Sequence, residues 1–167
     1  MSASPTGVEV DAASAILTAL RALHAPIVGV GVDAVDVERF RRILARRPGF
    51  AARYFSAAER ADAARGADPA ESLAARFAAK EAVMKALGTG IGGFALRDVE
   101  VRVRRRADDA GATGKAETGA PSLVLHAAAA AVAARRQATT LHLSLTHTSQ
   151  VAIAFVVAEG SQPCSPS

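Results

Sequence analysis

Residues 75–93 read ARFAAKEAVMKALGTGIGG, and this stretch decides how the rest of the chain is interpreted. A helix start precedes it, because Asp68 can cap a helix whose first position is Pro69. Gly88 follows the last residue of the apolar pattern, and glycine is common just after the end of a helix. The sequence therefore predicts one long helix from Pro69 to Leu87, followed by a glycine-rich turn.

The predicted helix carries charges where an apolar face is expected. Lys80 falls within the apolar stripe and Glu81 on its border, where ionised groups are costly unless they face a polar cleft or each other. Glu81 and Lys85 are one turn apart, so an ordinary surface ion pair is an alternative. However, Arg76, Lys80 and Lys85 surround a single carboxylate just before the turn Gly88–Thr89–Gly90. This combination predicts a cradle for phosphate and metal. The apolar stripe consists of Leu73, Phe77, Met84 and Leu87.

A second unusual charge lies upstream, in IVGVGVDAV (Ile27–Val35). This run is β-branched and nearly continuous, which predicts a buried strand with Asp33 as its one charge. A buried carboxylate must be hydrogen-bonded, paired or bound to a metal. Capping of a helix that begins at Val37 explains Asp33 equally well at this stage.

The remaining patterns indicate an α+β fold. Helices follow the first strand as a block, and the later strands are joined mostly as hairpins, which favours a mostly antiparallel sheet packed with helices. The predicted segments are a helix from Val37 with Arg39, Arg42 and Arg46 on one face, a helix opened by the capping box Ser56–Glu59, strands Asp98–Arg104, Ser122–Leu125, Leu141–Leu145 and Val151–Val157, and an Ala-rich helix His126–Arg136.

Composition limits the class of partner. The chain has 167 residues, the size of one domain, and 41 of them are Ala. No Trp and one Tyr leave few platforms for stacking single-stranded nucleic acid. The run RVRRR (Arg102–Arg106) is typical of a solvated strand edge, so no nucleic-acid partner is expected. A net charge of +4, with 17 Arg among 20 basic residues, still favours an anionic ligand.

The chain ends and the single cysteine suggest a location. Cys164 excludes an intrachain disulfide, no apolar run is long enough for a bilayer, and Glu9 and Asp11 stand where a signal peptide is basic. We expect a cytoplasmic protein with no membrane partner. Residues 1–26 are expected to form an extension with an amphipathic helix, 27–159 the main domain and 160–167 a flexible tail, with a polar loop at 107–120.

Four segments in order carry a resemblance to a known family: GVGVDAVDVERF (Gly29–Phe40), ARFAAKEAVMKALGTGIGG, LRDVEV (Leu96–Val101) and LSLTHTSQVAIAFVV (Leu143–Val157). Together they resemble the holo-acyl-carrier-protein synthases, the small trimeric 4'-phosphopantetheinyl transferases. The resemblance implies that residues 27–159 have the α+β transferase fold with active sites between subunits of a homotrimer. It also implies Mg²⁺-dependent transfer of 4'-phosphopantetheine from coenzyme A to a serine of an apo acyl carrier protein, releasing adenosine 3',5'-bisphosphate.

The same resemblance assigns roles to residues. Asp33 and Glu81 match the metal-binding and catalytic carboxylates, Lys85 would stabilise charge on a phosphate, and Arg39 and Arg42 would contact the carrier protein. Asp36 stands where many relatives have Glu. The residues expected to hold coenzyme A are Arg76, Lys80, Gly88, Thr89, Gly90, Ser144 and His147.

The identity of the general base stays open between Glu81 and a metal-bound water. The alternative function is a non-catalytic protein that binds coenzyme A or a nucleotide, which would need no pair of carboxylates beside its phosphate site.

Overall fold

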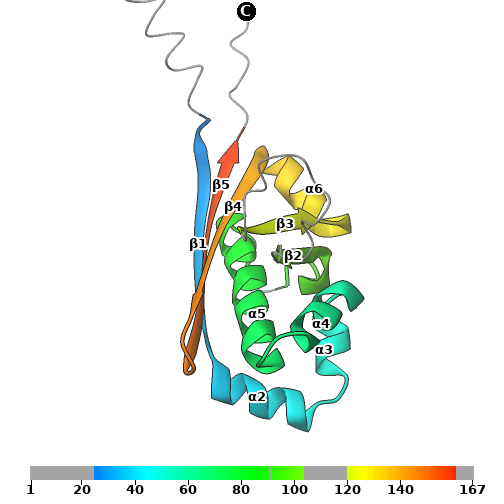
Figure 1. Ribbon diagram of the computed structural model, residues 1–167. Helices are drawn as coiled ribbons and strands as arrows, with labels where there is room; N and C mark the ends of the chain where they lie inside the picture. Colours follow the sequence, from blue (N-terminus) through cyan, green and yellow to red (C-terminus); the bar gives the residue numbers. More distant parts are fainter. Residues whose placement is uncertain (1–24, 91, 104–119, 161–167) are drawn as a thin grey trace, which may run out of the picture.

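The computed structural model describes residues 25–90, 92–103 and 120–160, and it confirms the α+β class (Figure 1). The predicted N-terminal helix, most of the predicted 107–120 loop and residues 161–167 of the predicted tail lie outside these ranges. The order of elements is β1 (Ile27–Asp36), α2 (Val37–Arg46), α3 (Phe50–Tyr54), α4 (Ala57–Ala64), α5 (Pro69–Ala86), the 3-10 helix η1 (Leu96–Asp98), β2 (Val99–Val103), β3 (Pro121–Leu125), α6 (Ala127–Arg135), β4 (Ala138–His147) and β5 (Val151–Gly160).

Two antiparallel sheets form the β layer. The larger one has the order β1–β5–β4, and β2 pairs with β3 in the smaller one. Strands β4 and β5 are each ten residues long, which is longer than predicted. Only two residues separate the end of α6 from the start of β4. Gln137 makes this abrupt junction possible by adopting the left-handed region at φ 56°. Gly160, assigned to the tail from sequence, is part of β5.

Helix α5 runs along one face of the larger sheet and lies directly on the backbone of β1 (Figure 1). A Cβ atom on Gly31 would lie 1.9 Å from the carbonyl oxygen of Ala82, and one on Gly29 would lie 1.8 Å from that of Ala86. Neither position tolerates a side chain without a backbone shift. Glycine on the strand and alanine on the helix therefore set the short distance between β1 and α5.

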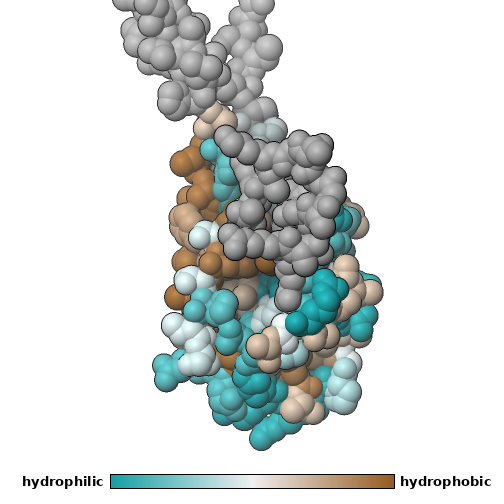
Figure 2. All heavy atoms as spheres, viewed as in Figure 1, coloured by the Kyte–Doolittle hydropathy of each residue, from teal (hydrophilic) through white to brown (hydrophobic). Residues whose placement is uncertain are grey.

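The prediction of a buried strand at Ile27–Val35 is wrong for one of its two faces. β1 is an edge strand, and Val30 and Val32 are 51% and 53% exposed on the face away from α5. With Phe155 of β5, 44% exposed, they form what we call the outer sheet face, visible as hydrophobic surface along the β1 side in Figure 2. A continuous apolar run implied cover on both faces, whereas within the described chain a helix covers only the glycine side.

A second core cluster joins α2, α3 and α5. Its centre is a set of aromatic rings, in which Phe40 lies 5.4 Å from Phe77 and 5.6 Å from Phe50, centroid to centroid. Arg41 of α2 donates two hydrogen bonds to the carboxylate of Asp68, the residue that caps α5. Helix α2 is therefore fixed against the start of α5. Helix α3 had no counterpart in the sequence prediction.

Candidate active site

Asp33 faces α5 and does not cap α2. Lys85 donates from Nζ to Asp33 Oδ1 and to the backbone oxygen of Val32, both at 2.8 Å. The cap of α2 is Asp36, whose side chain accepts from the backbone of Arg39 at 2.7 Å. The capping alternative for Asp33 is therefore excluded. Its other oxygen, Oδ2, is buried and has no hydrogen-bond partner among the described residues.

Glu81 completes a cluster of two carboxylates and one cation. Burial of the carboxyl and the charge of Asp33 raise the pKa of Glu81 above its ordinary value, and the charge of Lys85 partly opposes this. The neighbouring carboxylates of Asp33 and Glu81, with the Oδ2 atom of Asp33 buried and unpaired, are suited to a hard divalent cation such as Mg²⁺. Within the described ranges no group of three or more potential protein ligands exists, so further ligands would come from substrate or water.

The glycine turn continues directly from this cluster. Gly88 has φ 62°, and Thr89 donates from its backbone N–H and its hydroxyl to the carbonyl of Met84, at 3.0 and 3.2 Å. Arg136, at the end of α6, donates to the carbonyl of Gly88 at 3.1 Å. The turn predicted from sequence is thus held by a cation that the sequence did not single out. Arg136 lies 48 residues from Gly88, so no local pattern could have revealed it.

A cleft of about 480 Å³ lies beside the first half of α5. It contains Arg76 and His147, both predicted to hold coenzyme A, together with Leu145. His147 Nδ1 lies 2.7 Å from Glu71 Oε1. Arg76 is 3% exposed and donates to Ser72 and to Asp62. The structure adds Asp62, Glu71 and Ser72 to the residues that line this site. From sequence, Glu71 was recognisable only as a residue near a helix start.

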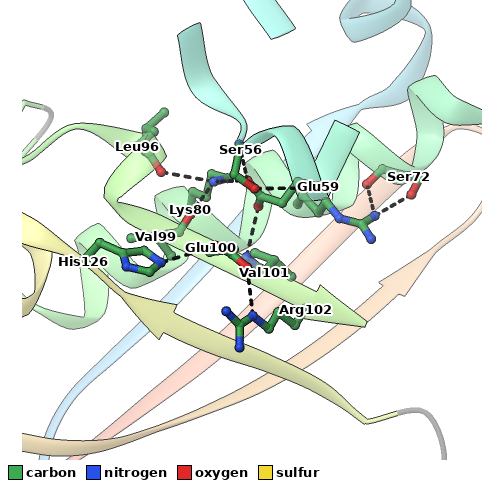
Figure 3. Close-up of polar contacts among 11 residues, drawn as sticks. Ser56, Glu59, Ser72, Lys80, Leu96, Val99, Glu100, Val101, Arg102 and His126 are labelled. Carbon is green, nitrogen blue, oxygen red and sulfur yellow. Dashed lines mark hydrogen bonds and ion pairs between the residues drawn. The ribbon is translucent and has the colours of Figure 1, made fainter. Parts of the chain in front are cut away.

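Other predicted residues lie elsewhere. The prediction of three cations around Glu81 is wrong, because the structure pairs Lys85 with Asp33, Lys80 with Glu59 and Arg76 with Asp62. Lys80 is fully buried and its Nζ bonds to Glu59 and to backbone oxygens, so its assignment to coenzyme A also needs correction (Figure 3). Ser144 is exposed and pairs with Phe155 in the sheet, away from the cleft of the same chain.

The arginines predicted to meet a carrier protein are exposed on α2. Arg42 lies 3.6 Å from Glu38 one turn earlier. The Arg39 guanidinium forms no ion pair within the described part of the chain, so its charge is open to a partner. None of the described helices is long and apolar enough to cross a bilayer.

The chain belongs to the 4'-phosphopantetheinyl transferase superfamily, whose model matches residues 29–155. Within that family it is similar to a holo-[acyl-carrier-protein] synthase of Clavibacter michiganensis, with 48% identity over 135 residues, covering 81% of this chain and 98% of the relative. The resemblance of the four sequence segments to the holo-acyl-carrier-protein synthases is confirmed.

Solved structures of the same family share the fold. The holo-[acyl-carrier-protein] synthase of Neisseria meningitidis matches with a TM-score of 0.66 and 30% identity, over 80% of this chain and 99% of that one. A synthase from Bacillus anthracis, solved in complex with CoA (3',5'-ADP), matches with a TM-score of 0.61 and 34% identity, over 81% and 98%. The predicted transferase fold is confirmed.

Proposed function

We propose that this chain transfers 4'-phosphopantetheine from coenzyme A to a serine of an apo acyl carrier protein, as a holo-acyl-carrier-protein synthase. The observation that carries the proposal is the cluster of Asp33, Glu81 and Lys85 between β1 and α5. A protein that only bound coenzyme A would present cations to its phosphates, and two adjacent carboxylates would weaken that binding. The family of the chain and its similarity to a coenzyme A complex support the same reaction.

Asp33 and Glu81 would hold Mg²⁺. The donor-free Oδ2 of Asp33 and the raised pKa of Glu81 support this assignment, because both carboxylates are stabilised by an added positive charge. When bound, the cation would supply charge neutralisation for the pyrophosphate of coenzyme A.

Lys85 is the residue that we propose acts on developing charge. Its side chain is 53% exposed, and it already bonds to the carboxylate that would hold the cation. Lys85 would therefore stabilise the leaving phosphate, where negative charge grows during transfer. The chain needs no nucleophile of its own, because the attacking hydroxyl belongs to the carrier. Arg76, His147 and the turn Gly88–Thr89–Gly90 would hold the rest of coenzyme A.

A homotrimer is part of the proposal. Asp33, Glu81 and Lys85 do not line the 480 Å³ cleft, so one chain presents two partial sites. The outer sheet face, with Val30, Val32 and Phe155 exposed, supports a subunit contact that would join partial sites of neighbouring chains. Val32→Asp should then yield monomers in sedimentation analysis and abolish transfer. The single Cys164 supports a cytoplasmic location for this activity.

One experiment tests the reaction directly. The protein is incubated with coenzyme A, Mg²⁺ and a panel of apo carrier proteins of fatty-acid and polyketide type, and the carriers are weighed by mass spectrometry. The expected result is a mass gain of one phosphopantetheine on at least one carrier. Binding of coenzyme A with no gain on any carrier would identify a coenzyme A-binding protein instead.

A further inference from the structure

Lys80 and Glu59 form an ion pair that is sealed from solvent and that the proposed reaction does not use. Lys80 is 0% exposed, Glu59 is 2% exposed, and Lys80 Nζ lies 2.9 Å from Glu59 Oε2 (Figure 3). The ammonium group also donates to the carbonyls of Leu96 and Val99. The three N–H bonds of Lys80 therefore have three acceptors, arranged around one point in the core.

Glu59 also accepts hydrogen bonds from the backbone of two other elements. Its Oε2 accepts from the backbone of Ser56 at 2.8 Å, which completes the predicted capping box of α4. Its Oε1 accepts from the backbone of Val101 at 3.0 Å, on the edge of β2 that does not face β3 (Figure 3). The pair thus connects α4, α5, η1 and β2 by directed hydrogen bonds.

This connection lies on the opposite side of α5 from its contact with β1. On the β1 side, the Gly31 backbone is pressed against the carbonyl of Ala82. Lys80 and Glu81 are neighbours in sequence and so point about 100° apart around the helix axis. A roll of α5 that moved Lys80 away from Glu59 would turn Glu81 and Lys85 away from Asp33 by the same angle.

We infer that Lys80 and Glu59 are positioning residues, which hold α5 in the rotation that brings Glu81 and Lys85 to Asp33. Apolar side chains of similar size would fill the same space, but non-directional packing does not select one rotation of a helix as hydrogen bonds to fixed backbone groups do. Buried ion pairs contribute little net stability, because desolvation offsets their attraction. That this rotation matters for catalysis rests on the proposed function. That the pair fixes the rotation rests on the geometry alone.

The test uses the double variant Glu59→Gln/Lys80→Met in the full chain. Replacing Lys80 alone would leave a buried carboxylate without its cation and unfold the protein for that reason, whereas the double variant is neutral and similar in volume. Val132→Ala is the matched control, because it opens a cavity in the same hydrophobic core from α6 and leaves the ion pair intact.

Two quantities are measured below the melting temperature of every variant. The first is the dissociation constant for Mg²⁺ in the presence of coenzyme A, by calorimetry, which we expect to rise about tenfold in the double variant, as for loss of an outer-shell partner. The second is the distance between Lys85 Nζ and Asp33 Oδ1 in crystals of the metal-free protein, which is 2.8 Å in the present structure. In the double variant it should exceed hydrogen-bonding distance, about 3.5 Å, as α5 turns away from β1. Val132→Ala should lower the melting temperature and change neither quantity.

A double variant that melts earlier but keeps the wild-type Mg²⁺ affinity and the wild-type distance between Lys85 and Asp33 would overturn the inference and leave the pair a purely structural one. Failure of the wild type to bind Mg²⁺ would instead contradict the proposed metal role. In that case the distance between Lys85 and Asp33 in the double variant still decides whether the pair positions α5.

Discussion

Lys85 Nζ and Asp33 Oδ1 lie 2.8 Å apart, 52 residues apart in the chain, and this bond joins α5 to β1 at the proposed site. The lysine is half-exposed, whereas the aspartate side chain is 11% exposed. Lys85 can therefore swing toward a ligand while Asp33 stays in place. The bond neutralises one of two crowded carboxylates in the metal-free protein.

Replacing Glu81 with Gln should stabilise the metal-free protein and abolish transfer. The folded-state pKa of Glu81 is raised, mainly by burial, so the folded protein binds its proton more tightly than the unfolded chain does. The tighter proton binding of Glu81 in the folded state favours folding at acid pH, and this contribution is lost as pH rises through the raised pKa. The stability advantage of Glu81→Gln should therefore grow as the pH rises from about 4 to about 7.

Thermal unfolding in chelator at the two pH values measures this difference, with exposed Glu38→Gln as the control. Transfer should fall by about 100-fold or more when a metal ligand is lost. An advantage of Glu81→Gln that is equal at both pH values would contradict the raised pKa.

Lys85→Met should reduce kcat more than it changes the KM for coenzyme A. The charge of Lys85 matters most as negative charge develops on the leaving group, so its loss should cost about 100-fold in kcat. Steady-state kinetics with varied coenzyme A separates the two constants. Arg135→Met, which removes an exposed cation from α6, should leave both unchanged. A change confined to KM would make Lys85 a residue of substrate binding only.

Arg39→Glu should raise the KM for the carrier protein and leave the KM for coenzyme A nearly unchanged. The Arg39 side chain is exposed on α2, and opposite charges speed the encounter with an acidic carrier. The increase should shrink at high salt, because screening removes the attraction in the wild type as well. Initial rates at two salt concentrations provide the measurement, with Arg135→Glu as the charge-matched control. Equal effects on both substrates would place carrier docking elsewhere.

Asp68→Asn should make the protein less stable at neutral pH and less sensitive to acid. The hydrogen bonds from Arg41 lower the pKa of Asp68 to about 2, whereas the pKa in the unfolded chain is 3.8. The ionised Asp68 therefore contributes fully to stability above pH 3.8, and this contribution is lost as pH falls through about 2. Because the pair is partly exposed, we expect a cost of only about 1 kcal/mol. Asn still caps α5, which confines the change to the ion pair.

Urea unfolding at about pH 7 and about pH 2 checks this, because most of the wild-type advantage over Asp68→Asn should be lost at the lower value. A difference that stays the same at the lower pH would mean that the variant had damaged the cap.

The sequence by itself determined the features that depend on neighbours within one helical turn. The cap Asp68, the capping box of Ser56 and Glu59, and the extent of α5 follow from hydrogen bonds between residues two to three positions apart. The order of the four family segments likewise identified the transferase and nominated Asp33, Glu81 and Lys85. These features need no knowledge of what packs against each element.

Tertiary structure decided what the charged residues do. Helical periodicity placed Lys80 on an apolar face, but its partner Glu59 lies 21 residues away and reaches it only because α4 packs on α5. The same holds for β1, whose glycines face α5 while its valines are left exposed. The free energy of a charge or an apolar side chain depends on the groups around it in space, and folding brings those groups together from distant parts of the chain.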